Sequence, residues 1–567
     1  MRIKEALKHV IAVLIIAYSG GLIPVYATEG AGRFAEVVFR HGRIHTMCAE
    51  QPEAEGMAIK DGFIMQVGTD QSLAPLIGPQ TKIIDLAGKR VLPGFIESHA
   101  HLLSLGKAEQ RLDLTGTRSL DEIVELVRER AAVMKPGEWI LGRGWDQNDW
   151  EKRVFPTYAE ISGAAPENPV FLTRIDGHAG WANLCAMSFA GLTRDTKDPE
   201  GGRIIRDGQG NPTGVLIDMA ELLISDKIPP MPSSLVKEAI VAGLRKSLSF
   251  GVTTFHDAGA DAQVIALYKE LLKENRLKPR LYVMLSQDAD LLDAYYQSGP
   301  EIGLGHHFLT VRAIKLYADG ALGSRGAALL EPYDDDPGNR GLIIDDEAKI
   351  AAITSRALET GFQVCTHAIG DRANRITLSA YESALKAHGD VRDARLRIEH
   401  AQILDSEDIP RFKELGVIPS MQPTHCTSDM PWAEERIHAR RAEEGAYVWR
   451  KLLDTGVVIP FGSDAPIESI NPLWGIYAAV TRQDHDGHPK EAWHPRQRLT
   501  VEEAVRAFTV HGAYAAFEEE IKGSLEEGKL ADFVVLSNDI MAISPSEILK
   551  TGVVMTVIHG AVVYEKQ

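Results

Sequence analysis

The chain has 567 residues, of which 44% are hydrophobic and 25% charged, and its formal net charge is −18. This composition is typical of globular proteins, and the length allows a barrel-sized domain with accessory domains. The negative charge argues against nucleic acid or an anionic membrane surface as the main partner. The four cysteines have no Cys-x-x-Cys spacing: Cys48, Cys185, Cys365 and Cys426. Export would permit disulfides, but a domain this large does not need them, and we expect the four to be free and buried.

Residues 1–27 are predicted to form a Sec-type signal peptide. Arg2 and Lys4 contribute to a basic start, residues 10–17 are apolar, and residues 25–27 resemble a small-residue cleavage site. The apolar stretch is too short to span a bilayer comfortably. We therefore expect an exported, periplasmic or secreted protein without stable membrane association after cleavage. An uncleaved anchor or an N-terminal strand is the alternative.

Both ends of the mature chain have the pattern of short β-strands joined by tight turns. Residues 35–92 contain five apolar runs separated by turn signals such as Asp61-Gly62, and the last 36 residues contain three more runs, two of them flanking His559-Gly560. We expect residues 28–92 and 516–567 to pair into one small β-sandwich domain.

The middle of the chain, residues 93–515, alternates apolar strand-like runs with helical patterns. Helical patterns cover 235–249, 262–274, 346–360 and 372–388, among others, and the strand-like runs are eight in number. Eight β-then-α units predict an α/β fold, a (β/α)8 TIM barrel. The block at about 119–230, between the first two strands, is too long for one connecting helix, and we expect an inserted subdomain over the barrel mouth.

The most informative motif is His99-Ala100-His101, at the end of the first predicted barrel strand. Side chains at positions i and i+2 of an extended segment project from the same face, so the two imidazoles can bind one divalent cation together. An isolated His-x-His pair is a weak motif and also occurs without a function. Its weight here comes from further candidate ligands downstream.

Barrel enzymes carry their chemistry at the carboxyl ends of the strands. The strand ends of this chain supply six candidate metal ligands: His99, His101, Lys315, His367, His400 and Asp464. Neutral imidazoles suit zinc and similar cations, and a carboxylate adds negative charge and can accept a proton. A histidine at one strand end is commonly structural, but the recurrence at successive strands predicts a metal site.

Lys315 is the unusual member, because an ammonium group should not lie beside a dication. Burial lowers the pKa of a lysine, and the neutral amine could take up carbon dioxide to form a carbamate that bridges two metal ions. The alternative is an ion pair between Lys315 and Asp319, two residues further on the same face.

The combined motifs resemble the amidohydrolase superfamily: residues 93–101, Lys315, His367, His400 and Ser463-Asp464-Ala465-Pro466. The finer pattern is similar to the YtcJ-like branch, amidohydrolase family 3, which includes N-substituted formamide deformylases. That pattern lies in 142–146, 176–183, 315–326, 421–425 and 523–532. The resemblance covers nearly all of the mature chain.

The resemblance implies two metal ions, usually zinc, bridged by carboxylated Lys315. His99 and His101 would hold one ion, and His367 and His400 the other. Asp464 would bind metal and act as general base and acid. The chain departs from the family at Glu97, where Asp is usual, and we expect the longer side chain to alter contacts around the metal without abolishing the site.

Further residues are candidates for the pocket. His178 could approach the substrate or stabilise an oxyanion, with a buried structural histidine as the alternative. Trp145, Asp319, Arg325 and His425 are candidate substrate-binding residues. For Trp145 the alternative is packing in the inserted subdomain, and for Arg325 it is pairing with nearby acids.

We expect a metal-dependent hydrolase that cleaves a carbon–nitrogen bond, of amide or formamide type but not a peptide bond, in a small molecule with a metal-activated hydroxide. One alternative is a mononuclear deaminase of a heterocyclic ring, which Lys315 argues against because one-metal members generally lack the bridging lysine. The other is a catalytically silent periplasmic binding protein, which retention of all six ligands argues against. The sequence leaves the substrate and a homo-oligomeric state open.

Overall fold

The computed structural model describes the chain except residues 1–33, 175–178, 200, 390, 392 and 567. The predicted signal peptide and His178 therefore lie outside the described residues. Within the described part, every helix is too short or too polar to cross a membrane. The four cysteines are free, but only Cys365 and Cys426 are buried, whereas Cys48 and Cys185 are partly exposed.

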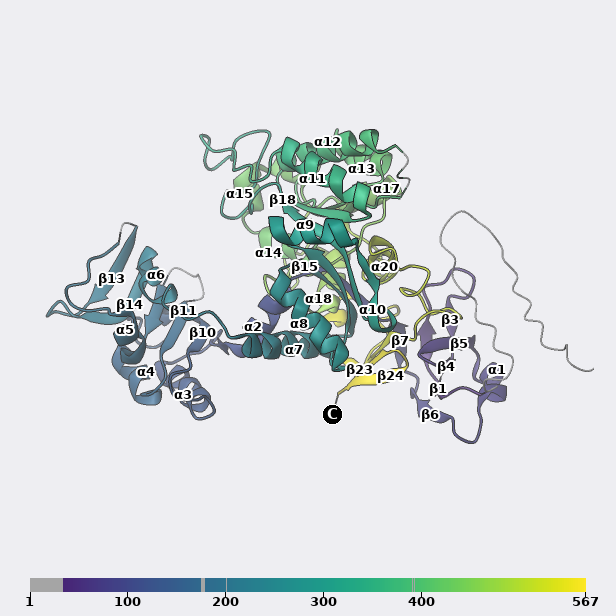
Figure 1. Ribbon diagram of the computed structural model, residues 1–567, viewed down its shortest axis with the longest axis horizontal. Helices are drawn as coiled ribbons and strands as arrows, with labels where there is room; N and C mark the ends of the chain where they lie inside the picture. Colours follow the sequence, from purple (N-terminus) through teal and green to yellow (C-terminus); the bar gives the residue numbers. More distant parts are fainter. Residues whose placement is uncertain (1–33, 175–178, 200, 390, 392, 567) are drawn as a thin grey trace, which may run out of the picture.

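The centre of the molecule is a parallel barrel sheet, which confirms the predicted fold class (Figure 1). Seven strands follow one another around it, in spatial order β21-β20-β19-β18-β16-β15-β8. In chain order they are β8 (Phe95–Ala100), β15 (Val252–Ala260), β16 (Arg280–Leu285), β18 (Leu309–Tyr317), β19 (Gln363–Ala368), β20 (Arg397–His400) and β21 (Ile418–Ser420). Their side chains are almost all buried, as expected for parallel strands covered on the outside by helices.

The eighth predicted strand, at 457–462, closes the barrel with an irregular backbone. It pairs with β21 through a single bridge, Met421 with Phe461, and with β8 through the bonds Ser98 N–H to Phe461 O (3.2 Å) and Asp464 N–H to His99 O (2.7 Å). Pro460 has no N–H to donate to a ladder, which helps to explain why no regular strand forms. The closure nevertheless fixes Asp464 beside the end of β8.

The outer helices follow the predicted periodic segments closely. They include α7 (Ser233–Ser249), α8 (Ala262–Lys273), α11 (Glu347–Thr360) and α12 (Asp371–Ala387). The ends of α11 carry typical signals, because the Asp346 side chain accepts the Lys349 N–H and Gly361 ends the helix in the left-handed conformation (φ 84°).

The inserted block forms its own α/β unit. Its sheet has the order β13-β14-β12-β11-β10-β9, from β9 (Leu112–Asp113) through β10 (Ile140–Trp145), β11 (Val170–Arg174), β12 (Ala179–Ala182) and β13 (Gly202–Arg206) to β14 (Pro212–Asp218). Helices α3 (Leu120–Ala131), α4 (Tyr158–Ala164), α5 (Leu184–Ala190) and α6 (Leu222–Ser225) pack around it.

This subdomain stands to one side of the barrel and is connected to it through α2 (Leu102–Gln110) and α7 (Figure 1). That the subdomain covers the barrel mouth stays a prediction. Helices α2 and α7 approach closely at two glycines: a Cβ on Gly106 would lie 1.7 Å from Ala239 O, and one on Gly243 2.8 Å from Leu102 O. Backbone-to-backbone packing of this kind holds the two connecting helices firmly together.

Both chain ends build the small β-sandwich, as the fold class predicted. One sheet is β5-β4-β1-β6, from β1 (Val37–Arg40), β4 (Gly56–Lys60), β5 (Phe63–Gly68) and β6 (Lys82–Asp85). The other is β24-β23-β22-β7-β2-β3, from β2 (Arg43–His45), β3 (Glu53–Ala54), β7 (Arg90–Pro93), β22 (Phe533–Leu536), β23 (Val553–Ile558) and β24 (Ala561–Glu565). Strands β7 and β22 pair directly, so distant parts of the sequence share one ladder.

Two hairpin turns of the sandwich lie against each other. Asp61 and Gly62 between β4 and β5, and His559 and Gly560 between β23 and β24, all have positive φ. Two consecutive residues with positive φ are what tight two-residue hairpins require, and Asp-Gly is a strong signal for them. A Cβ on Gly62 would lie 1.9 Å from the His559 ring, so only glycine fits there.

Candidate metal centre

Residues predicted at separate strand ends converge at one end of the barrel. His99 lies near the end of β8, Lys315 near the end of β18 and His367 near the end of β19, and His400 is the last residue of β20. The ring centroids of His99 and His400 are 5.0 Å apart, and those of His367 and His400 are 4.5 Å apart. Parallel pairing of neighbouring strands brings these side chains to one edge of the sheet.

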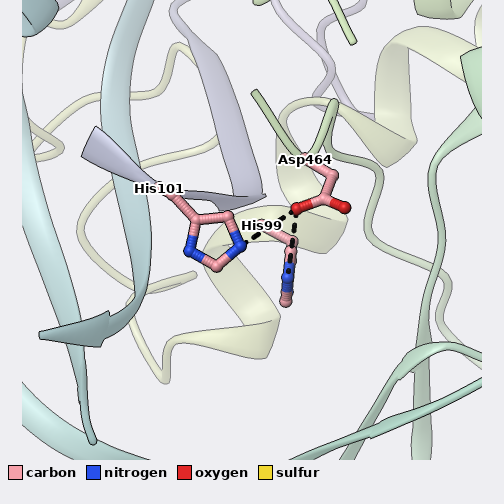
Figure 2. A group of neighbouring side chains, drawn as sticks. All are labelled: His99, His101 and Asp464. Carbon is pink, nitrogen blue, oxygen red and sulfur yellow. Dashed lines mark ion pairs between the residues drawn. The ribbon is translucent and has the colours of Figure 1, made fainter. Parts of the chain in front are cut away.

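The first group of candidate ligands is His99, His101 and Asp464 (Figure 2). His101 Nε2 lies 3.2 Å from Asp464 Oδ1, and His99 Nε2 lies 3.7 Å from the same oxygen. One ligand atom from each residue lies within 4.8 Å of the other two. The two imidazoles of the His-x-His motif thus face one carboxylate oxygen and could hold one ion with it.

The second group is His400, His425 and Asp464, again with ligand atoms within 4.8 Å of one another. His425 lies on α14 (Pro423–Asp429), which follows β21. Its Nε2 is 3.7 Å from Asp464 Oδ2, and its ring stacks on that of His400 with an interplanar angle of 16°. His425 was predicted to bind substrate, but its side chain lies among the candidate metal ligands.

His367 lies beside this cluster but does not form a group of three candidate ligands with its members among the described residues. Its Nε2 is 3.5 Å from Asp319 Oδ1. The Asp319 carboxylate in turn accepts N–H donors from Ala328 (2.8 Å), Ile369 (2.9 Å) and Gly370 (2.8 Å). Asp319 is 1% exposed and ties the loop after β18 to the end of β19, which differs from its predicted contact with substrate.

Lys315 points into the barrel, as its position in the strand predicted. Its Nζ lies 3.3 Å from His99 Nε2, and burial lowers the pKa of the amine. Within the described chain, Lys315 and Asp319 do not form an ion pair, so the alternative pairing is not realised. A buried amine with a lowered pKa is what carboxylation would require, and that modification stays a prediction.

Buried polar partners orient the imidazoles. Glu399 Oε2 accepts the His99 Nδ1–H at 2.5 Å, and Arg397 Nε binds the other carboxylate oxygen at 2.8 Å. Burial alone would raise the pKa of the Glu399 carboxyl, but Arg397 and His99 hold it well below its usual range. Gln422 Oε1 lies 2.8 Å from His400 Nδ1. Both hydrogen bonds engage Nδ1, so Nε2 is the atom of each imidazole that could bind a metal ion.

Sequence reasoning missed Glu399 and Arg397. They alternate along β20 with the apolar Ile398, and all three are fully buried. Charged residues at alternate positions of a buried parallel strand are unusual, because burial of a charge is costly unless it is paired. That pattern, next to His400, was the signal available in the sequence.

The donor set fits a divalent metal ion. Among the described residues, Asp464 Oδ1, His367 Nε2 and His425 Nε2 are buried atoms without a hydrogen-bond partner. Burial lowers the pKa of His99 to about 4, so its imidazole is neutral, as a ligand must be. Burial by itself would raise the pKa of the Asp464 carboxyl, but the surrounding histidines hold it well below its usual range. Imidazoles and an ionised carboxylate are ligands that zinc prefers.

Residues 82–564 match the amidohydrolase family. The chain belongs to the amidohydrolase family. It is 37% identical to Protein LONG AFTER FAR-RED 3 of Arabidopsis thaliana, over 90% of this chain and 89% of that protein. It is 34% identical to the putative amidohydrolase YtcJ of Bacillus subtilis, over 94% of this chain and all of that protein.

An N-substituted formamide deformylase of Arthrobacter pascens is 27% identical over 94% of this chain and 98% of that enzyme. Among solved structures, an uncharacterised metal-dependent hydrolase of Pyrococcus furiosus is 29% identical and superposes with a TM-score of 0.74, covering 89% of this chain and 99% of that one. The predicted YtcJ-like branch is confirmed, and the comparisons support a metal-dependent hydrolase.

In this amidohydrolase, Glu97 connects two strand ends that carry candidate metal ligands, His99 and Asp464. Its carboxylate accepts the His99 N–H at 2.9 Å and the Ser463 N–H at 2.9 and 3.0 Å. It is fully buried, and burial raises its pKa to about 8. A Cβ on Gly462 would lie 2.4 Å from Glu97 Oε1, so the longer side chain is accommodated by a glycine opposite. Glu97 thus holds the backbone beside His99 and Asp464.

The amidohydrolase holds two candidate metal ligands in strained backbone conformations. His400 has φ 76° and Asp464 has φ 60°, a region that non-glycine residues rarely adopt. Such strain costs of order 1–3 kcal/mol per residue and persists where the surroundings fix it, commonly at functional sites. Both conformations occur where a strand ends and the chain turns out of the barrel.

Two predicted substrate-binding residues lie elsewhere. Trp145 is fully buried in the core of the inserted subdomain and donates its Nε1–H to Leu172 O at 2.8 Å. Arg325 pairs with Asp335, with Nη2 to Oδ2 at 2.8 Å. For both residues the structure agrees with the alternative of packing or acid pairing.

Proposed function

We propose that this amidohydrolase hydrolyses a carbon–nitrogen bond of amide or formamide type, other than a peptide bond, in a small molecule. The observation that carries the proposal is Asp464, an ionised carboxylate that lies between two groups of imidazoles at the mouth of the barrel. The similarity to the Arthrobacter pascens enzyme named N-substituted formamide deformylase supports this type of bond. Zinc in two sites is part of the proposal.

A divalent ion held by these ligands would lower the pKa of water from about 15.7 towards ~7 and polarise the substrate carbonyl. Asp464 is the base that accepts the proton from the attacking water, because its carboxylate is ionised and directed at the ligand cluster. It then donates that proton to the leaving nitrogen. A carbon–oxygen bond forms, the carbon–nitrogen bond breaks, and an acid and an amine are released.

The neighbouring residues keep this arrangement in place. Glu399 and Gln422 fix the imidazole orientations of His99 and His400 through their Nδ1 atoms. Glu97 binds the backbone on both sides of the cluster, at His99 and at Ser463. The base is thereby held rigidly, as efficient proton transfer requires.

The test is a substrate panel with zinc-loaded protein whose metal content is measured in the same sample. The panel contains N-substituted formamides, other amides, esters and amino-substituted heterocycles, and both product halves are quantified. We expect amine release from formamides or amides. Asp464→Asn should lower kcat by about 10²–10⁴-fold, the usual contribution of a general base. Asp334→Asn, at an exposed acidic residue, is the control and should retain full activity.

Other results would favour the alternatives. Ammonia release from ring substrates, with one ion per chain, would indicate a deaminase. No turnover of any class by fully metallated protein would indicate a binding protein. Full activity of Asp464→Asn would remove Asp464 from the mechanism.

A further inference from the structure

We propose that His256 is a positioning residue for the candidate metal centre and acts on it through Arg397. The inference deepens the proposed function and rests on it for the presence of a metal ion. It concerns a side chain in the barrel core that is not itself a candidate ligand, and it is argued from the contacts of that side chain.

The first observation is a hydrogen bond that crosses the interior of the barrel. His256 lies on β15 and Arg397 on β20, two strands that are not neighbours in the sheet. Arg397 Nη1 lies 3.1 Å from His256 Nδ1, and both side chains are fully buried. A guanidinium has only donors, so His256 Nδ1 is the acceptor and the neutral ring carries its proton on Nε2. Burial and the charge of Arg397 lower the pKa of His256 well below its usual value, which agrees with a neutral ring.

Among the described residues, Arg397 provides the hydrogen bond that this imidazole makes. His256 Nε2 is a buried atom without a partner, and the ring packs on that of Tyr282 with the centroids 5.1 Å apart. A buried polar group without a partner costs free energy, so an apolar side chain would be the more favourable occupant if packing alone decided. The acceptor that His256 offers to Arg397 is the property that offsets this cost.

The guanidinium that His256 holds reaches both the backbone and the carboxylate beside a candidate ligand. Arg397 Nη2 donates to Ser98 O at 2.6 Å and to Glu399 Oε2 at 3.1 Å, and its Nε lies 2.8 Å from Glu399 Oε1. Ser98 directly precedes His99. The same Glu399 Oε2 accepts the His99 Nδ1–H at 2.5 Å. The position of Arg397 therefore sets the backbone before His99 and the carboxylate that orients its ring.

Loss of the acceptor at position 256 would leave Arg397 Nη1 without its partner in a fully buried place. An unpaired buried donor is costly, and a guanidinium that turns towards another acceptor takes Glu399 with it. The His99 ring would then be held less firmly in the orientation that a metal ion requires. Metal affinity, and not only stability, should therefore depend on an acceptor at position 256.

The test is a pair of substitutions of similar shape that differ in the acceptor. His256→Asn can place its Oδ1 where Nδ1 lies, whereas His256→Leu has no acceptor. The matched control is Tyr282→Phe, beside His256 in the sheet, which keeps the ring but removes the hydroxyl that donates to Gln363 Oε1 at 2.9 Å.

Three quantities are measured without substrate. Zinc affinity is obtained by competition with a chromophoric chelator, and the visible absorption of bound Co²⁺ reports the ligand geometry. Urea unfolding of metal-free protein reports stability. We expect His256→Leu to bind zinc about tenfold more weakly and to change the Co²⁺ absorption. His256→Asn should retain zinc affinity within about threefold of the wild type and keep the wild-type absorption.

Tyr282→Phe should lower the urea midpoint and leave both metal readouts unchanged. If His256→Leu does not unfold cooperatively, His256→Phe takes its place, because it keeps a ring against Tyr282 but has no acceptor. Absence of a cooperative transition in both apolar variants would mark His256 as a purely structural residue and overturn the assignment.

Four other results would also overturn it. They are wild-type metal readouts in the apolar variant, an equal loss of zinc affinity in His256→Asn, an equal loss in Tyr282→Phe, and no zinc binding by the wild type. Absence of amide turnover by wild-type protein that binds zinc would instead contradict the proposed function, and it would leave this assignment intact because the three readouts need no substrate.

Discussion

Replacing Glu399 with Gln tests whether buried charge behind the ligands tunes the metal centre. The variant keeps the shape of the side chain but removes its charge. It weakens the 2.5 Å hydrogen bond from His99 Nδ1–H and leaves Arg397 without its counter-charge, at a site where all three side chains are fully buried.

The expected magnitudes follow from these contacts. Loss of a residue that orients a ligand typically weakens metal affinity or activity by about 10–100-fold, which is about 1.4–2.7 kcal/mol. Removing one partner of a buried ion pair typically destabilises a fold by about 3–5 kcal/mol. We therefore expect weaker zinc binding together with a lower urea midpoint.

The matched control is Asp532→Asn. Asp532 is also buried and paired with a buried arginine, Arg280, at 2.6 and 2.9 Å, but Arg280 begins β16 at the opposite end of the barrel. This variant should lose stability without losing zinc affinity. Affinity is measured by competition with a chromophoric chelator, and stability by urea unfolding of metal-free protein. Zinc affinity of Glu399→Gln within about threefold of the wild type, or an equal loss in Asp532→Asn, would refute the reasoning.

Three other predictions concern packing, metal loading and pH. Gly462→Ala should reduce zinc affinity at least tenfold, because the added Cβ would lie 2.4 Å from Glu97 Oε1. The control Gly163→Ala, with open space around the added Cβ, should leave zinc affinity unchanged. Equal zinc affinity of the two variants would contradict this prediction. Removal of zinc by chelator should lower the urea midpoint of unfolding, since a free ion at about 1,000 times its Kd stabilises a fold by about 4 kcal/mol. A urea midpoint that does not depend on zinc would exclude zinc binding that favours the folded state. His45 donates to Glu502 and Glu53, which raise its pKa above 6.5, so its contribution to stability is present below pH ~6.5 and is lost as pH rises through the raised pKa. His45→Gln should remove that part of the pH slope in urea unfolding between pH 6 and 9, and an unchanged slope would show that His45 does not contribute.

For the inserted subdomain, the sequence predicts that the unit exists but not how it is positioned relative to the barrel. The length of the block between β8 and β15 predicted an inserted unit, and its sheet from β9 to β14 is present. Its position beside the barrel depends on how α2 and α7 pack at Gly106 and Gly243, a contact that neither segment reveals alone. The same holds for Trp145, whose neighbours in the subdomain core determine that it is buried there.

The amino-acid sequence alone predicted the barrel, the sandwich built from both chain ends and the clustering of His99, His400 and Asp464. These features depend on local patterns of strand and helix, and on the rule that parallel strands of a barrel end at the same edge. Only the tertiary structure decided which side chains face each other within that edge. His425 is directed at Asp464 and Glu399 at His99, because backbone turns after the strands and packing of remote segments set side-chain directions. No local pattern encodes those directions, since each depends on two parts of the chain that are far apart in sequence.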